Sequence, residues 1–105
     1  MKILFHKYTE QDKSDILRMM RDFTAIDNYP FDRITREENL EEFSSNELLG
    51  RLYLIQKDDR NIGYIVLSFG FSFEYRGRDA FIDEFYIDEQ FRNQGIGKMN
   101  LNLLK

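Results

Sequence analysis

The chain contains no cysteine and no tryptophan, and only one histidine and one proline among its 105 residues. Without cysteine there is no disulfide framework, no thiol nucleophile and no thiolate zinc site. A single histidine gives no basis for a metal site built from several histidines. No apolar run approaches the roughly 20 residues that span a bilayer. We therefore expect no metal, no redox chemistry and no membrane partner, and we expect a cytoplasmic protein.

Basic residues are fewer than acidic ones, with 15 Lys and Arg against 19 Asp and Glu, and the formal net charge is -4. Surfaces that bind nucleic acid carry a clustered excess of Lys and Arg. The balance therefore argues against a nucleic-acid partner and favours a cationic one. A hydrophobic fraction of 42% is enough for one small core. We expect a single globular domain over residues 1–105.

The first part of the chain predicts a short strand and then a helix. The strand covers Ile3 to Phe5. Thr9, with Asp12 three residues later, resembles an N-cap, and Pro30 predicts that the helix ends near Asn28. Apolar residues recur on one side of this helix at a spacing of three to four, which predicts its core-facing stripe. That stripe consists of Ile16, Leu17, Met20, Phe23 and Ile26.

A second helix is predicted from a capping box formed by Thr35 and Glu38. Its apolar side is narrow, with Leu40 and Phe43 between acidic residues. We therefore expect this helix to be more exposed than the first.

The middle of the chain is rich in strand-forming residues separated by turns. Three strands are predicted, over Arg51–Gln56, Ile62–Phe73 and Phe81–Ile87. Turn-forming residues separate them at Asp58–Asn61 and around Gly77. The strands should form an antiparallel meander, and together with the helices they predict an α+β fold.

The last of these strands breaks the simple alternation of a half-buried strand. Ile82 lies in one phase, whereas Phe85 and Ile87 lie in the other. A β-bulge at Asp83-Glu84 would place all three apolar residues on one face and would leave a backbone amide unpaired. A strand buried on both faces explains the same pattern, and both interpretations stay open.

The segment after this strand contains Arg92, Gly95 and Gly97 in the pattern R-x-x-G-x-G, followed by an apolar stretch that predicts a helix. Glycines let the backbone approach a ligand closely, and the first amides of a helix point at an anion in front of it. Lys98 adds charge to the same site. The dinucleotide fingerprint lacks its third glycine, since Asn100 stands there. The pattern therefore predicts a pyrophosphate site outside the common nucleotide-binding loops.

This pattern, directly after a bulged strand, resembles the acyl-CoA signature of the GNAT superfamily of N-acetyltransferases. The stretch from Gly77 to Ile87, with Phe91 and Arg92, is most similar to the diamine and polyamine acetyltransferase branch. The resemblance implies a GNAT-like α+β fold (the acyl-CoA N-acyltransferase fold), an antiparallel meander flanked by helices. Because that fold continues beyond the motif helix, we expect a C-terminally truncated version that ends within or just after this helix.

The resemblance also implies an activity. The chain is expected to move an acetyl group from acetyl-CoA to a primary amine of a small cationic substrate, similar to a diamine or polyamine. Asp83 and Glu84 are the implied catalytic carboxylates, and strand alternation predicts that only one of them reaches the substrate. The implied cofactor-binding residues are Phe85, Tyr86, Ile87, Arg92, Asn93, Gln94, Gly95, Ile96, Gly97 and Lys98.

The alternative is a truncated, catalytically silent module that binds CoA or another protein. If the family's next strand is absent, the predicted strand Phe81–Ile87 has an open edge, and open edges pair readily with other chains. We therefore expect the chain to form a homodimer or to be part of a longer polypeptide.

Overall fold

The computed structural model describes residues 3–72 and 77–92. Its main elements are β1 (Ile3–Lys7), α1 (Lys13–Ile26), α2 (Arg33–Ser45), β2 (Gly50–Lys57), β3 (Arg60–Ser72) and β4 (Gly77–Ile87). Short 3-10 turns at Glu10–Asp12 and Glu89–Phe91 precede α1 and follow β4. The order expected from the sequence is confirmed over these residues. The helix expected after Gly97 lies outside them.

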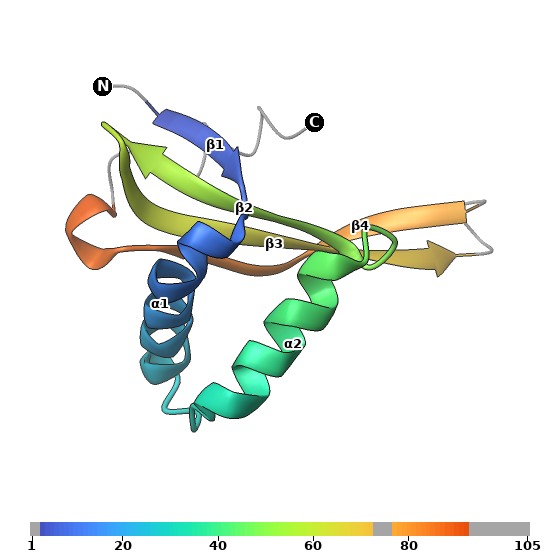
Figure 1. The fold of residues 1–105 in the computed structure, drawn as a ribbon, viewed down its shortest axis with the longest axis horizontal. Coiled ribbons are helices and arrows are strands. Elements are labelled where there is room, and N and C mark those ends of the chain that lie inside the picture. The colour runs from blue at the N-terminus through green and yellow to red at the C-terminus, as the bar shows by residue number, and fades with distance from the viewer. Residues whose placement is uncertain (1–2, 73–76, 93–105) are drawn as a thin grey trace.

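The four strands form one antiparallel sheet in the order β1-β2-β3-β4 (Figure 1). This arrangement confirms the α+β fold with its antiparallel meander. β1 pairs with the outer side of β2, and Phe5 lies opposite Ile55. The β2–β3 hairpin turns at Asp58 and Asp59, whose φ values of 51° and 66° are left-handed. Two successive residues with left-handed φ values form a two-residue turn whose twist matches the right-handed twist of the flanking strands.

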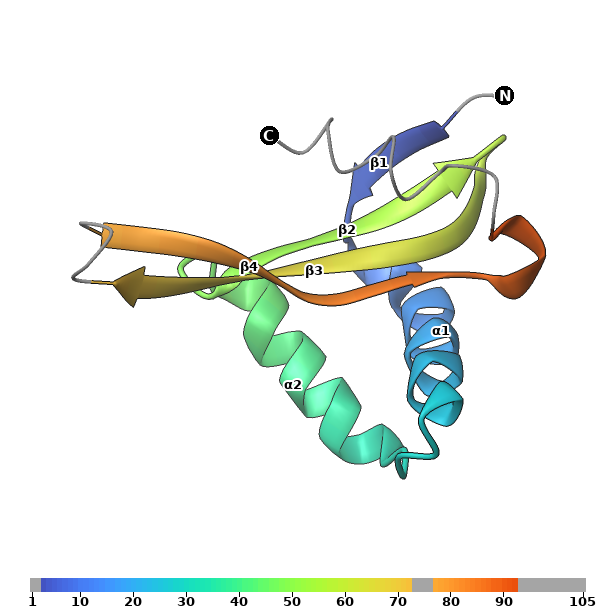
Figure 2. The ribbon, with the colours of Figure 1, turned by 180° about the vertical axis from the view of Figure 1, so that it is seen from behind.

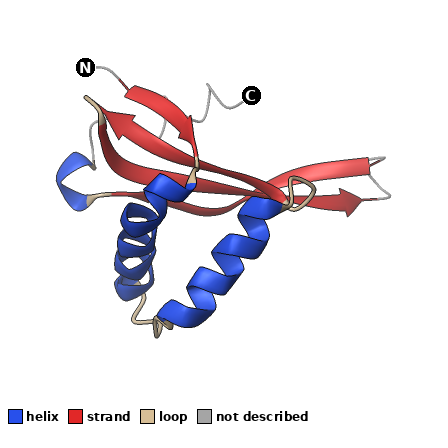
Figure 3. Ribbon diagram, viewed as in Figure 1, coloured by secondary structure: helices blue, strands red, loops and turns tan. Residues whose placement is uncertain are grey.

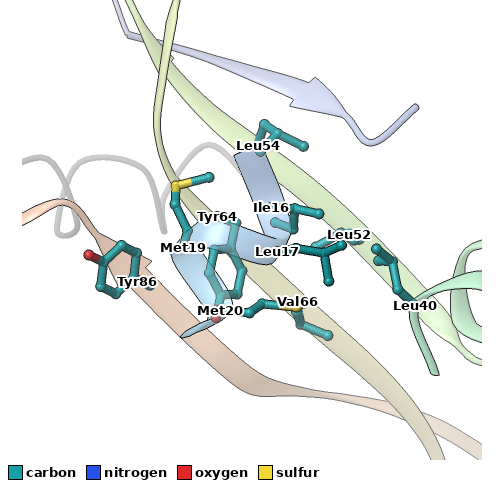
Figure 4. Packing of buried hydrophobic residues seen from close by; sticks show 10 residues of the cluster. All are labelled: Ile16, Leu17, Met19, Met20, Leu40, Leu52, Leu54, Tyr64, Val66 and Tyr86. Atoms are coloured by element: carbon teal, nitrogen blue, oxygen red, sulfur yellow. The ribbon is translucent and has the colours of Figure 1, made fainter. Parts of the chain in front are cut away.

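Both helices pack on the same face of the sheet (Figures 2 and 3). The core between the helices and this face includes the fully buried side chains of Ile16, Met19, Leu54 and Tyr64 (Figure 4). Ile26 was expected in this core, but its side chain is 57% exposed. It is the last residue of α1, so no further turn of the helix covers it. None of the described helices is long and apolar enough to cross a membrane.

The two helix starts differ in how well the sequence predicts them. Thr9 and Asp12 do interact before α1, because the amide and hydroxyl of Thr9 donate to Asp12 Oδ2 at 3.0 and 3.2 Å, but Thr9 is the N-cap of the short 3-10 turn and Asp12 is the N-cap of α1. The start of α2 was placed too late, because Asp32 is its N-cap and its Oδ1 accepts hydrogen bonds from the amides of Ile34 and Thr35. The structure uses Asp32 because its carboxylate accepts hydrogen bonds from two of the free amides of the first turn.

The register between β3 and β4 contains the expected bulge. Val66 lies opposite Glu84 and the next residue, Leu67, lies opposite Ile82, so Asp83 is the extra residue of β4. The apolar residues Ile82, Phe85 and Ile87 lie opposite Leu67, Ile65 and Gly63. Because alternate residues of a strand share a face, all three lie on the face away from the helices. The bulge interpretation is therefore confirmed, and the alternative of a strand buried on both faces is not needed.

Candidate active site

A cavity of about 400 Å³ lies between the helices and the face of the sheet that they cover. This volume is within the range of small-molecule sites. Its apolar lining includes Leu40, Leu52 and Val66, and its charged lining is Arg36, Asp83 and Glu84. We refer to it as the acidic cavity. Its walls come from α1, α2 and the three strands β2, β3 and β4, so the fold itself builds it.

Asp83 and Glu84 both line the acidic cavity. The alternation of a regular strand would send neighbouring side chains to opposite faces, and that expectation is wrong here. The extra residue in β4 interrupts the alternation, and a bulge directs two successive side chains to the same side. The feature that makes the strand irregular is therefore the feature that brings the two carboxylates together.

Both oxygens of Glu84 are hydrogen-bonded. Oε2 accepts from Nη1 of Arg36 at 3.0 Å, and Oε1 accepts from the hydroxyl of Tyr64 at 2.8 Å. The side chains of Arg36 and Glu84 are only 27% and 15% exposed, so water screens this ion pair less than one on the surface. Burial, and then the charge of Glu84, raise the pKa of Tyr64 well above its usual value. The hydroxyl thus stays protonated and keeps donating to Glu84.

Asp83 differs from its neighbour in having its carboxylate open to the cavity. Its side chain is exposed, and within the described part of the chain it has neither a hydrogen-bond partner nor an ion-pair partner. One carboxylate of the pair is therefore fixed by the protein, and the other is available to a ligand.

The amides of Phe85 and Ile87 point away from β3. The amide of Asp88 donates to the carbonyl oxygen of Ile62 at 2.7 Å, which makes Asp88 and Ile62 a hydrogen-bonded pair of the ladder. In an antiparallel ladder such pairs alternate with pairs whose N–H and C=O groups point outward. Phe85 and Ile87 belong to the outward pairs, on the side of β4 that no described strand covers.

Arg92 is fixed beside this edge by two contacts. Its Nε donates to the carbonyl oxygen of Ile87 at 2.7 Å, and its guanidinium carbon lies 5.3 Å from the centre of the Tyr86 ring. A second cavity of about 240 Å³, mainly apolar, is lined by Phe85, Tyr86, Ile87 and Arg92 together with the end of α1. The structure therefore groups the four described residues expected to bind the cofactor. The other six, Asn93, Gln94, Gly95, Ile96, Gly97 and Lys98, lie outside the described residues.

These residues suit an acyl-CoA group. The outward amides of Phe85 and Ile87 are hydrogen-bond donors, the apolar cavity suits an alkyl chain, and the Arg92 guanidinium suits a phosphate. In residues 3–72 and 77–92 there is no group of three side chains able to hold a metal ion.

Two residues of the site were missed by the sequence analysis. Arg36 lies in a helix with several charged neighbours and gives no signal of its own, and Tyr64 follows the pattern of a core residue. Their role depends on the pairing register and on the position of α2 over the sheet, which the sequence pattern does not give. Tyr64 was detectable only through the register, which puts it two residues from Val66, the partner of Glu84.

The comparison with protein families matches residues 16–105 to the model described as the acetyltransferase (GNAT) family. No curated protein sequence matches the chain.

Solved structures with the same fold cover nearly the whole chain. An integron cassette protein from the mobile metagenome of Cole Harbour Salt Marsh has a TM-score of 0.89 and 27% identity, over 95% of this chain and 66% of its own. A GNAT family acetyltransferase from Staphylococcus aureus has a TM-score of 0.78 and 20% identity, over 99% of this chain and 76% of its own. A predicted acetyltransferase from Clostridium acetobutylicum, in a crystal structure with acetyl-CoA, has a TM-score of 0.76 and 18% identity, over 98% of this chain and 71% of its own. The chain thus spans just under two thirds of the cassette protein.

Proposed function

Because this chain belongs to the GNAT family of acetyltransferases, we propose that it transfers an acetyl group from acetyl-CoA to a primary amine of a small cationic acceptor. The observation that carries the proposal is the bulge at Asp83, which puts an unpaired carboxylate in the acidic cavity, on the same strand as the outward amides of Phe85 and Ile87. The similar fold of the Clostridium acetobutylicum protein, solved with acetyl-CoA, supports the choice of acetyl donor.

The residues along β4 would hold the donor. Acetyl-CoA supplies an acetyl group activated as a thioester, so that a carbon–nitrogen bond forms while a carbon–sulfur bond breaks. The outward amides of Phe85 and Ile87 donate hydrogen bonds to the acyl-pantetheine part, and an amide aimed at the reacting carbonyl oxygen stabilises negative charge that develops there. Arg92, and the sequence-predicted loop from Asn93 to Lys98, bind the phosphates.

Asp83 would act on the acceptor. An alkyl amine has a pKa of about 10 and is protonated at neutral pH, so it must lose a proton before it becomes a nucleophile. The Asp83 carboxylate attracts the ammonium and accepts its proton, directly or through a water molecule. Glu84 is less suited to this task because Arg36 and Tyr64 already donate to both of its oxygens.

The sequence resemblance favours a diamine or polyamine as the acceptor. This choice also rests on the presence of two carboxylates in one cavity. The proposal of a homodimer through the edge of β4 likewise rests on the sequence. Such a dimer would cover the amides of Phe85 and Ile87 and would compete with binding of the donor.

Two measurements on the purified chain test the proposal. Calorimetric titration with acetyl-CoA and with CoA should show binding of both, and release of free thiol should require acetyl-CoA and an amine together. Binding without thiol release over a broad panel of amines would favour the catalytically silent CoA-binding module. Absence of binding would contradict the proposed donor.

A further inference from the structure

Arg36 is the one described residue that brings a positive charge to the lining of the acidic cavity. Its Nη1 is bonded to Glu84, and the structure shows no partner for its Nε or Nη2 among the described residues. A guanidinium has five N–H donors in a planar arrangement that matches a carboxylate. The cavity therefore offers unused donors to an anion as well as an unpaired carboxylate to a cation.

The pairing of Arg36 with Glu84 also changes the charge that a ligand meets. One guanidinium offsets one of the two carboxylates, which leaves Asp83 as the open negative group. A second ammonium would then lie beside Arg36 and be repelled by it, and like charges brought together in a partly buried site disfavour binding. The charge at the acidic pair thus favours one bound ammonium over two.

We propose that the acceptor is a small zwitterion, an amino-acid-like molecule whose ammonium binds at Asp83 and whose carboxylate binds at Arg36. The proposal rests on the proposed function for the reaction, but it concerns the ligand class of the cavity. It replaces the diamine or polyamine that the sequence resemblance favours as the preferred acceptor. The apolar side of the cavity, with Leu40, Leu52 and Val66, takes the carbon chain between the two charged groups.

Three probes of similar length separate the two classes: 4-aminobutanoate, 1,4-diaminobutane and butylamine. Their affinities are measured by calorimetry with CoA present, where no acetyl group can be transferred, and their turnover is measured by thiol release with acetyl-CoA. The native chain should bind 4-aminobutanoate roughly tenfold more tightly than 1,4-diaminobutane, with butylamine between them. Turnover as kcat/KM should follow the same order.

Arg36→Gln should reverse the order, because it removes the anion-binding group and releases Glu84 for a second ammonium. Arg36→Lys keeps the charge, so it should keep the native order of affinities while binding each probe more weakly. This variant replaces Arg36→Gln in the measurement if Arg36→Gln does not fold. Arg33→Gln is the matched control, since Arg33 lies on the same helix but is 69% exposed and pairs with Glu37. This control should leave the native order unchanged.

The outcomes separate the ligand class from the reaction. Equal or tighter binding of the diamine by the native chain would contradict a zwitterionic acceptor. The same conclusion would follow if Arg36→Gln left the order of the probe affinities unchanged. The predicted order of affinities without turnover of any probe would support the ligand class and contradict the acetyltransferase reaction.

Discussion

Arg36 and Glu84 form an ion pair of 3.0 Å that joins α2 to the bulged segment of β4. The two residues are 48 positions apart in the sequence. It has two effects on the acidic cavity. It fixes Glu84 as part of the wall, and it leaves Asp83 as the carboxylate that a ligand can reach. The adjacent acids of the sequence are therefore two chemically different groups in the folded protein.

Replacing Tyr64 with Phe tests how firmly Glu84 is held. The variant removes the hydroxyl that donates to Oε1 at 2.8 Å while Arg36 still bonds Oε2. Because a hydrogen bond to a buried charged group is lost, the free energy of unfolding should fall by about 1 to 3 kcal/mol. Urea unfolding at neutral pH measures this difference. A variant as stable as the native chain would mean that the contact does not hold Glu84.

The same variant predicts a difference at alkaline pH. The folded state raises the pKa of Tyr64 above the unfolded value of about 10. The stability that this shift represents is present below the unfolded pKa and is lost as pH rises above it, because only the unfolded chain ionises. Native stability should therefore fall more steeply than that of Tyr64→Phe in urea unfolding above about pH 10. Parallel profiles would contradict this pKa direction.

Asp32 should contribute to stability in a pH-dependent way through the start of α2. The hydroxyl of Thr35, together with backbone amides, lowers the pKa of Asp32 from its usual value. Its contribution is therefore present above the ordinary carboxyl pKa and is lost as pH falls through the lower folded pKa. Asp32→Ala should lower the melting temperature at neutral pH, and the difference from the native chain should disappear in acid. Asp32→Asn keeps a capping oxygen but has no charge, so its loss at neutral pH should be smaller, and its difference from the native chain should also shrink as pH falls. A difference for Asp32→Ala that persists in acid would contradict the capping role.

Gly95→Val tests the loop that the sequence predicts for the phosphates, which lies outside the described residues. A side chain there should crowd the pyrophosphate or strain the turn, so affinity for acetyl-CoA should fall by roughly tenfold or more in calorimetry. Circular dichroism verifies that the variant folds. Unchanged affinity in a folded variant would remove this loop from the cofactor site.

The sequence predicts most of the fold because its local signals agree with one another. The apolar stripe of α1, the turn at Asp58 and Asp59, and the interrupted alternation near Asp83 each correspond to a described feature. The errors lie at the ends of helices. The start of α2 is at Asp32 and not at the predicted capping box of Thr35, and Ile26 keeps the helical period at the exposed end of α1.

The site was less predictable because its organisation depends on contacts between distant residues. Sequence spacing indicates that Asp83 and Glu84 matter together, but alternation places them on opposite faces, and only the register shows them on one side. The contribution of Arg36 depends on where α2 crosses the sheet. No local pattern contains this information, so the asymmetry of the acid pair emerges only from the folded chain.

The most direct test of the account compares Asp83→Asn with Glu84→Gln in thiol release from acetyl-CoA at a saturating amine concentration. Both substitutions keep the size of the side chain and remove its charge. If Asp83 takes the proton of the acceptor, Asp83→Asn should lower kcat by roughly 10²-fold or more, within the range of general acid-base effects. Glu84→Gln should lower it by less, and its main effect should be on stability and acceptor preference. Near-native rates for Asp83→Asn, or a larger loss for Glu84→Gln in a folded variant, would contradict the assignment of the reacting carboxylate.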